Sequence, residues 1–219
     1  MVLSGHGRGG SFLNGLYGMG LPGEWVLSVD DHVDTIDFGT WFFGHHEAYV
    51  DTSDANLPPL TGRVVDYTER RVLALLDWAA AELGHDTARV YATGASMGGT
   101  FAVFMCWHFP ERIAAGYALV PKVSFARQLG ELYYTRFSWN RLWGDIDANL
   151  PCSNGYDTYA WLDPFRLSRE EPRRRPAPLL AFFGREDDFT GWAEKVSYLR
   201  HADTLGFGGA LFWDTRNHN

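Results

Sequence analysis

The sequence predicts an α/β fold, with a mostly parallel central sheet and flanking helices, in one domain that spans residues 1–219. Apolar runs bounded by Gly, Pro or Asp alternate with segments of helical periodicity, as in folds whose parallel strands are joined by crossover helices. Hydrophobic residues make up 46% of the 219 residues and charged residues 21%, which is ordinary globular usage and excludes wholesale disorder. No internal repeat or Gly/Ser linker divides the chain.

Strands are predicted wherever a short apolar run ends at turn residues. These runs cover residues 1–4, 25–29, 89–93, 113–120, 179–183 and 210–213. The clearest helix is predicted over 63–83, where apolar residues recur at helical spacing and Gly84 supplies a stop signal. Two further helices are predicted over 100–109 and 192–205. Residues 121–178 are expected to form an irregular, aromatic-rich insertion that resembles a lid.

Charge and composition exclude several classes of protein. The 19 Lys and Arg against 27 Asp and Glu give a net charge of −8. A chain this acidic, with one short basic run at 173–175, is a poor nucleic-acid binder, and no apolar run reaches the length of a membrane span. We therefore expect no nucleic-acid or membrane partner. The sequence begins without a recognisable signal peptide, and localisation and oligomeric state are left open.

The two cysteines, Cys106 and Cys152, exclude a disulfide-dense scaffold and a four-cysteine zinc site. They either pair with each other or remain as buried thiols.

The segment Gly94–Gly98 matches the pattern G-x-S-x-G, between a predicted strand and an apolar helix. In that context Ser96 is a candidate nucleophile at a sharp strand-to-helix turn, where small neighbours let other segments approach closely. The helix that follows directs its N–H groups at developing negative charge, with the Met97 N–H as one donor. The alternative is an ordinary glycine-rich β-to-α turn.

A serine nucleophile needs a base and an acid that orients the base. His218 is the candidate base, because it follows the last predicted strand by five residues, and loops at strand carboxyl ends collect function in open α/β sheets. Asp187 follows the strand 179–183 and is the candidate acid, with its neighbour Asp188 as the alternative. The other interpretations are a terminal histidine without a role and two solvated turn aspartates.

A second glycine-rich loop, His6–Gly10, follows the opening strand and offers further backbone N–H groups, from Arg8 or Gly7, for an oxyanion hole. The loop lacks the motifs of phosphate and dinucleotide sites. We expect His6 to be a structural residue of this loop.

Residues His45–Glu47 and the acidic residues after them do not have the spacing of a known metal motif, and we expect no metal.

With these residues in view, the chain resembles the serine esterases of the α/β-hydrolase superfamily. The resemblance is greatest to the polyhydroxyalkanoate depolymerase, feruloyl esterase and acetylxylan esterase-like branch. It rests on His6–Gly10, on Arg89–Gly99, on the turn Gly184–Asp187 and on His218. The chain is expected to lack the strands that usually come before the strand bearing the first glycine-rich loop, and also the helix that usually follows the histidine.

The resemblance implies carboxylesterase chemistry without a cofactor. Ser96 would be the nucleophile, His218 the base and Asp187 the acid, acting on small acyl, phenolic, polysaccharide-linked or polyester esters. Trp41, Phe42 and Trp161 are candidate substrate-binding residues, although loop aromatics equally form small cores. The alternatives are a prolyl oligopeptidase-like peptidase, an acyltransferase and a catalytically inactive hydrolase-fold binding protein.

Overall fold

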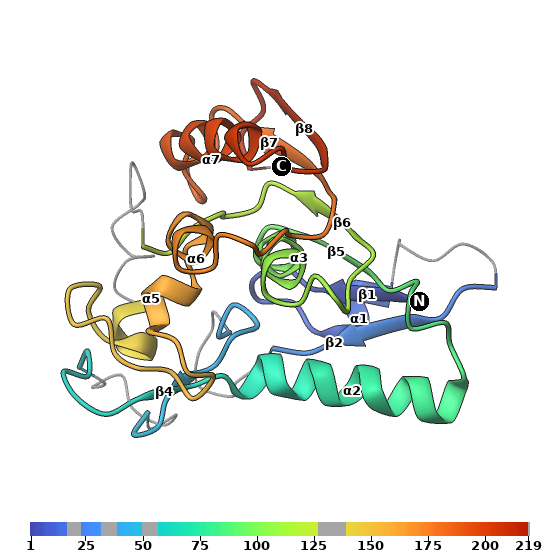
Figure 1. The fold of residues 1–219 in the computed structure, drawn as a ribbon, viewed down its shortest axis with the longest axis horizontal. Coiled ribbons are helices and arrows are strands. Elements are labelled where there is room, and N and C mark those ends of the chain that lie inside the picture. The colour runs from blue at the N-terminus through green and yellow to red at the C-terminus, as the bar shows by residue number, and fades with distance from the viewer. Residues whose placement is uncertain (17–22, 32–38, 50–56, 127–138, 219) are drawn as a thin grey trace.

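The computed structural model describes residues 1–16, 23–31, 39–49, 57–126 and 139–218. Its centre is a parallel six-stranded sheet with the strand order β2-β1-β5-β6-β7-β8 (Figure 1). The strands are β1 (Val2–Gly5), β2 (Val26–Val29), β5 (Tyr91–Ala95), β6 (Ala115–Leu119), β7 (Leu179–Gly184) and β8 (Gly209–Asp214). The predicted α/β fold class is confirmed, and each of the six predicted strands is present.

The described helices include α1 (Phe12–Leu16), α2 (Tyr67–Leu83), α3 (Met97–His108) and α7 (Ala193–Thr204), which flank this sheet, and the short α5 (Thr158–Trp161) and α6 (Pro164–Glu170) inside the insertion 121–178. In Figure 1 the sheet runs from β2, beside α2, to β8, beside α7. Gly84 ends α2 in the left-handed conformation, with φ 60°, as the sequence predicts.

Two predicted helix starts are wrong. Helix α2 begins four residues later than expected, because Val64–Val65 form the short strand β4, which pairs antiparallel with β3 (His45–His46). Helix α3 begins three residues earlier, directly after Ser96, and so includes Gly98 and Gly99. Glycine has a low helix propensity, and these two glycines are needed there by close packing, since a Cβ on Gly98 or Gly99 would overlap backbone atoms of neighbouring strands or loops.

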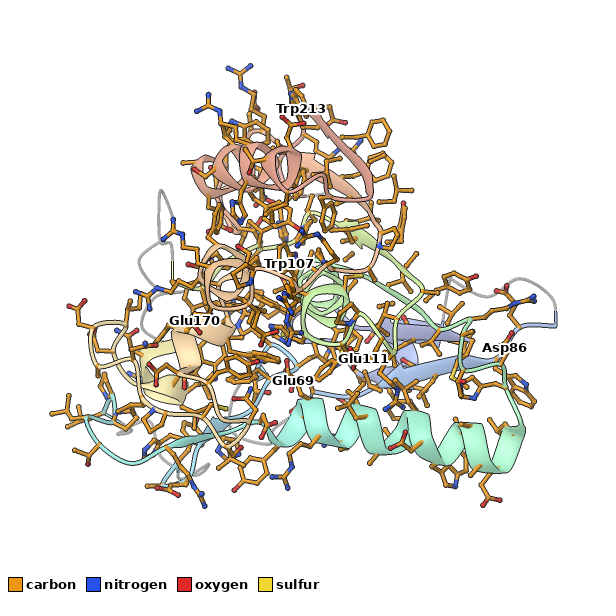
Figure 2. All side chains as sticks on the ribbon, viewed as in Figure 1. Glu69, Asp86, Trp107, Glu111, Glu170 and Trp213 are labelled. Atoms are coloured by element: carbon orange, nitrogen blue, oxygen red, sulfur yellow. The ribbon has the colours of Figure 1, made fainter. Side chains whose placement is uncertain are left out.

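Helix α3 is the centre of the core, and all of its residues are buried. It packs on one sheet face, where a Cβ on Gly116 would lie 2.5 Å from the sulfur of Cys106. Its Trp107, which Figure 2 labels inside the molecule, donates to the hydroxyl of Tyr198 on α7 at 3.0 Å. A helix buried on every side has no amphipathic pattern, which is why the sequence shows an almost wholly apolar run.

Aromatic side chains of the insertion 121–178 extend the core around α3, and Phe125 stacks on Phe104 with ring centroids 5.8 Å apart. Phe125 contacts Trp139 and Trp143 edge-on, with ring centroids 4.9 Å apart in both pairs. The Trp143 indole donates to the carbonyl of Gly44 at 2.7 Å, which ties the insertion to the segment before α2. These tryptophans are fully buried, and so is Tyr159. Loop aromatics that could have lined a cleft therefore form a core.

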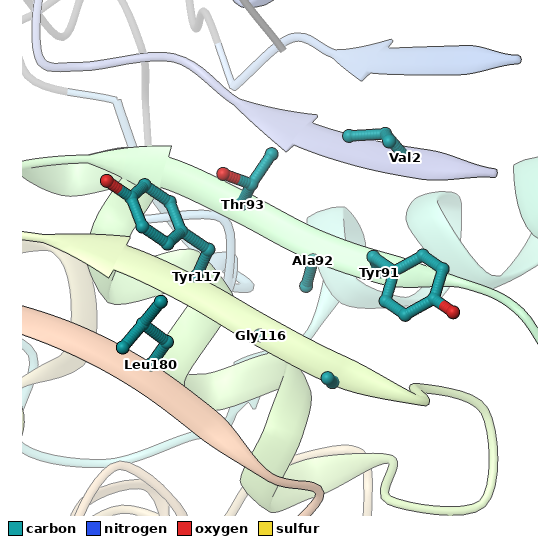
Figure 3. A pocket seen from close by; sticks show the side chains of 8 residues that line it. Val2, Tyr91, Ala92, Thr93, Gly116, Tyr117 and Leu180 are labelled. Atoms are coloured by element: carbon teal, nitrogen blue, oxygen red, sulfur yellow. The ribbon is translucent and has the colours of Figure 1, made fainter. Parts of the chain in front are cut away.

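The opposite face of the sheet is partly open. Helix α1 packs there against β1 and β2, whereas apolar side chains over β5 to β8 are exposed. Tyr91 is 43% exposed, Leu180 37% and Phe212 49%. Figure 3 shows Tyr91, Tyr117 and Leu180 around a shallow hollow of about 250 Å³ on this face.

Within the described segments no helix is long and apolar enough to cross a membrane. Cys106 and Cys152 are both free and buried, and burial raises the pKa of each thiol to about 12.

Candidate active site

Ser96 lies between β5 and α3 in a conformation that non-glycine residues rarely adopt, with φ 57° and ψ −119°. The turn is possible because glycines surround it. A Cβ on Gly98 would lie 2.1 Å from the carbonyl oxygen of Gly5, and a Cβ on Gly94 would lie 2.4 Å from the backbone of Gly98. This close packing sets β1 against the start of α3 and presents the Ser96 hydroxyl at the carboxyl edge of the sheet.

The loop after β8 brings His218 to this serine. The Ser96 hydroxyl and Nε2 of His218 are 2.7 Å apart, and Nδ1 lies 3.0 Å from both carboxylate oxygens of Asp187. An ionised carboxylate only accepts, so the Nδ1–H donates to it and Nε2 is left to accept from the hydroxyl. The loop passes directly over Gly184, where a Cβ would lie 2.5 Å from the carbonyl of Asn217.

The two candidate acids are clearly distinguished. Asp187 is 3% exposed, whereas Asp188 is exposed and accepts from the amide of Asn217 instead of the imidazole. Burial alone would raise the pKa of Asp187. Hydrogen bonds from His218 and Thr190 and the nearby Lys195 ammonium outweigh burial and hold this pKa well below its usual range. The Asp187 side chain is therefore a carboxylate throughout the neutral range.

Three buried charged residues behind Asp187 were not expected from the sequence. The Lys195 ammonium lies 3.2 Å from Oδ2 of Asp187, and the Lys122 ammonium lies 2.7 Å from Oε2 of Glu194. All three of these side chains are fully buried. In the sequence they look like ordinary surface charges, because their burial depends on partners from separate segments.

A cavity of about 290 Å³ opens beside the serine. Among the described residues, its lining includes Gly7, Arg8, Trp41, Ser96, Phe189 and His218. The backbone of the first glycine-rich loop thus borders the same space as the hydroxyl, as a second set of oxyanion donors requires. Met97 is the first residue of α3, so its N–H is at the helix N-terminus.

Two predicted substrate-binding residues lie elsewhere. Phe42 is 2% exposed and packs on Phe101 of α3, with ring centroids 4.5 Å apart. Trp161 is 4% exposed, stacks on His108 and donates to Glu69. Both are core residues: Phe42 packs against α3, and Trp161 of the insertion packs against His108 at the end of α3. Trp41 alone of the three predicted residues lines the cavity.

His6 has a structural position in the first loop. Its Nε2 accepts from the N–H of Asp31 at 2.9 Å, so its Nδ1–H donates to the carbonyl of Gly7 at 2.7 Å. Asp31 in turn accepts from the hydroxyls of Thr40 and Thr68 and holds the loop that carries Trp41.

His46 accepts from the N–H of Ala48 through Nδ1, and its Nε2 lies 2.9 Å from the carbonyl of Thr61. No cluster of three metal-ligating side chains occurs in the part of the chain that the structure describes. The acidic residues Asp51 and Asp54 and the neighbouring Asn56 lie outside the described residues.

The sheet order, the flanking helices and the strained serine turn define the α/β-hydrolase fold. Solved structures with this fold include an S-formylglutathione hydrolase from Agrobacterium tumefaciens, which is 16% identical over all of this chain and 76% of its own, with a TM-score of 0.66. A fluorophosphonate-binding serine hydrolase of Staphylococcus aureus is 15% identical over the same shares of the two chains, with a TM-score of 0.58. A Bacillus cereus carboxylesterase is 18% identical over all of this chain and 79% of its own, with a TM-score of 0.56.

No family model and no curated protein matches the sequence. At these identities the similarity establishes the fold, and the reaction has to be argued from the site.

Proposed function

We propose that the protein is a serine-dependent carboxylic ester hydrolase, with Ser96 as nucleophile, His218 as base and Asp187 as orienting acid. The observation that carries the proposal is the continuous hydrogen-bonded chain from the Ser96 hydroxyl through the imidazole to a buried carboxylate. A serine hydroxyl is a weak nucleophile, and such a chain activates it.

The reaction has two steps. Ser96 Oγ attacks the ester carbonyl carbon while its proton moves to Nε2 of His218, and the oxyanion accepts hydrogen bonds from the backbone N–H of Met97 and of Arg8 or Gly7. The bond to the alcohol then breaks, and the alcohol leaves with the proton from Nε2. Water attacks the resulting acyl-enzyme by the same route, and the acid is released as Oγ regains its proton.

The cavity favours esters with a short acyl group. Its volume of about 290 Å³ has to hold both the acyl group and part of the alcohol, and its lining is largely apolar, with Trp41 and Phe189 among the walls. A small acyl group also agrees with the formyl group in the name of one structural neighbour, and ester hydrolysis agrees with the carboxylesterase named for another. We include in the proposal the phenolic, polysaccharide-linked and polyester esters of the feruloyl esterase and depolymerase-like branch.

The test is hydrolysis of p-nitrophenyl acetate by the wild type, by Ser96→Ala and by Ser197→Ala, a control serine whose hydroxyl bonds only within α7 among the contacts described. We expect turnover by the wild type and the control and none above background by Ser96→Ala. Equal turnover by Ser96→Ala would refute the proposal. A series of longer acyl chains, feruloyl and acetylxylan esters and peptide p-nitroanilides then separates the ester classes from peptidase activity.

A further inference from the structure

Asp187 of the proposed triad is one of four buried charged side chains that form two adjacent ion pairs. Asp187 contacts Lys195, Glu194 contacts Lys122, and the two pairs are electrostatically coupled through Glu194 and Lys195. These four side chains come from three segments: the turn after β7, the first turn of α7 and the start of the insertion at Lys122. Next to Lys122, the N–H of Val123 also donates to Glu194 at 3.0 Å. Buried ion pairs generally stabilise a protein no more than apolar side chains of similar volume would. Stability alone therefore does not explain why two ion pairs are buried beside Asp187, and a functional role is a better explanation.

Lys195 fixes the direction of hydrogen bonds around Asp187. Its ammonium donates to Oδ2 of Asp187 at 3.2 Å and to the hydroxyl oxygen of Thr190 at 2.6 Å. Because Thr190 accepts from Lys195, its own proton is directed to Oδ2, at 2.6 Å. The Phe189 and Thr190 N–H groups occupy Oδ1 at 2.9 and 3.0 Å. The carboxylate is thus held in one orientation, with its remaining acceptor capacity toward His218.

Lys195 also opposes the charge that His218 acquires. Protonated His218 is stabilised by the negative Asp187, and a positive charge on the other side of that carboxylate offsets part of this stabilisation. With His218 neutral, the cluster of two carboxylates and two ammonium groups has no net charge. A proton on His218 would give it a charge of +1.

We propose that Lys195 is a positioning residue for the catalytic acid, which orients the Asp187 carboxylate and offsets part of the attraction between that carboxylate and a positively charged His218. The proposal rests on the proposed function of the triad. The low pKa of Asp187, to which the Lys195 ammonium contributes, agrees with a charged contact, whereas burial lowers the pKa of Lys195 against the opposing effect of Asp187 and Glu194.

The other groups that face these side chains are few among the described residues. The groups that face Lys195 are Asp187 and Thr190 from the turn, Glu194 from its own helix, Lys122 from the start of the insertion and the Phe183 ring from β7, at 5.7 Å.

The groups that face His218 are Asp187, Ser96 and the Phe189 ring. Arg8 lines the same cavity, and Asp188 is bonded to Asn217, the residue before His218. Arg8 and Asp188 are exposed, so solvent screens their charges, and the buried Asp187–Lys195 pair dominates.

The test compares Lys195→Met with Lys122→Met in the pH profile of kcat/KM for p-nitrophenyl acetate. Both substitutions remove a fully buried ammonium, and only Lys195 contacts the acid. For Lys195→Met we expect the acidic limb to move up by about 0.5 to 1 pH unit and the plateau kcat to fall about tenfold with KM within about twofold. For Lys122→Met we expect lower thermal stability and an acidic limb within about 0.2 pH units of the wild type.

Two further variants test the same role of Lys195 if Lys195→Met folds poorly. Lys195→Gln keeps a donor without the charge, so its acidic limb should move upward while kcat stays closer to the wild-type value. In the Asp187→Asn background, Lys195→Met removes a stranded charge, so it should raise the melting temperature without lowering kcat further.

An unmoved acidic limb in Lys195→Met or Lys195→Gln would overturn the proposal. The same shift in Lys122→Met, or an additive loss of kcat in the Asp187→Asn background, would also overturn it. Failure of the wild type to hydrolyse esters would refute the proposed function instead. Wild-type turnover that Ser96→Ala abolishes, together with an unchanged profile in the Lys195 variants, would refute only the role of Lys195.

Discussion

Replacing Asp187 by Asn should damage both catalysis and stability, and the structure gives the reason. Each described group that bonds the carboxylate is a donor: two backbone N–H groups at Oδ1, the Lys195 ammonium and the Thr190 hydroxyl at Oδ2, and the His218 Nδ1–H between them. The NH₂ group of the substituted side chain would therefore face donors in either orientation. Facing Nδ1, it would favour the tautomer that places the imidazole proton on Nε2, where the Ser96 proton has to go.

If Asp187 acts as the proposed acid, we expect kcat for p-nitrophenyl acetate to fall by about 10³- to 10⁴-fold, the size of this effect in established serine triads. Removing one partner of a buried ion pair also costs about 3–5 kcal/mol of unfolding free energy, or about 10 °C in melting temperature for a chain of this size. Steady-state kinetics and thermal unfolding followed by circular dichroism measure the two effects.

Asp188→Asn is the matched control, because its carboxylate is exposed and bonds only to Asn217 among the contacts described. It should keep kcat within about threefold and unfolding free energy within about 0.5 kcal/mol. More than a tenth of wild-type kcat in Asp187→Asn, or equal losses in the two variants, would refute this reasoning.

The remaining predictions concern glycine packing beside Ser96, the loop that carries Trp41, and the pH dependence of stability. Gly98→Ala should lower unfolding free energy by more than about 3 kcal/mol in urea titrations, because its methyl group would overlap the Gly5 carbonyl, whereas Gly208→Ala, with its nearest contact at 3.6 Å, should stay within about 1 kcal/mol. Asp31→Ala leaves four donors without their acceptor, so calorimetry should show a loss of about 3 kcal/mol or more and the KM for p-nitrophenyl acetate should rise. Because the folded pKa of Asp187 is lowered, its contribution to stability is complete above about pH 4 and is lost as pH falls through the folded value. The stability gap between wild type and Asp187→Asn in urea titrations should therefore shrink as pH falls below about pH 4; a gap at about pH 2 as large as the gap at about pH 5 would contradict the direction of the shift.

The sheet could be predicted from the sequence because each strand is a short apolar run that ends at Gly, Pro or Asp, a local signal. Helix α1 was missed because five residues are too few for a periodic pattern. The start of α3 was misplaced because glycine propensity argues against a helix, whereas contact with β1 requires glycine there.

Ser96 could be chosen as candidate nucleophile from a local motif, and His218 could be chosen as candidate base from its place after the last strand. The choice between Asp187 and Asp188 depended on the way the histidine loop crosses Gly184, a contact between segments distant in the sequence. The assignment of Trp161 to the cleft was wrong for a related reason: an aromatic residue in an insertion gives no signal of which side it packs on.

The buried lysines were beyond prediction, because a charged side chain is stable inside a protein only where distant segments supply its partners. Glu194 lies one residue before Lys195 in the sequence, yet its closest ammonium comes from Lys122, 72 residues away. No local pattern identifies such a pair.

The most direct test of the proposed chemistry is reaction with a fluorophosphonate followed by intact mass and peptide mapping. The probe phosphonylates only a serine that a functioning base activates, so it reports on nucleophile and base together. We expect one adduct per chain on Ser96 in the wild type, none in Ser96→Ala and a reaction at least about 100-fold slower in His218→Ala. A wild type that remains unmodified, or an adduct that persists in Ser96→Ala, would contradict the proposal that this chain is a serine hydrolase.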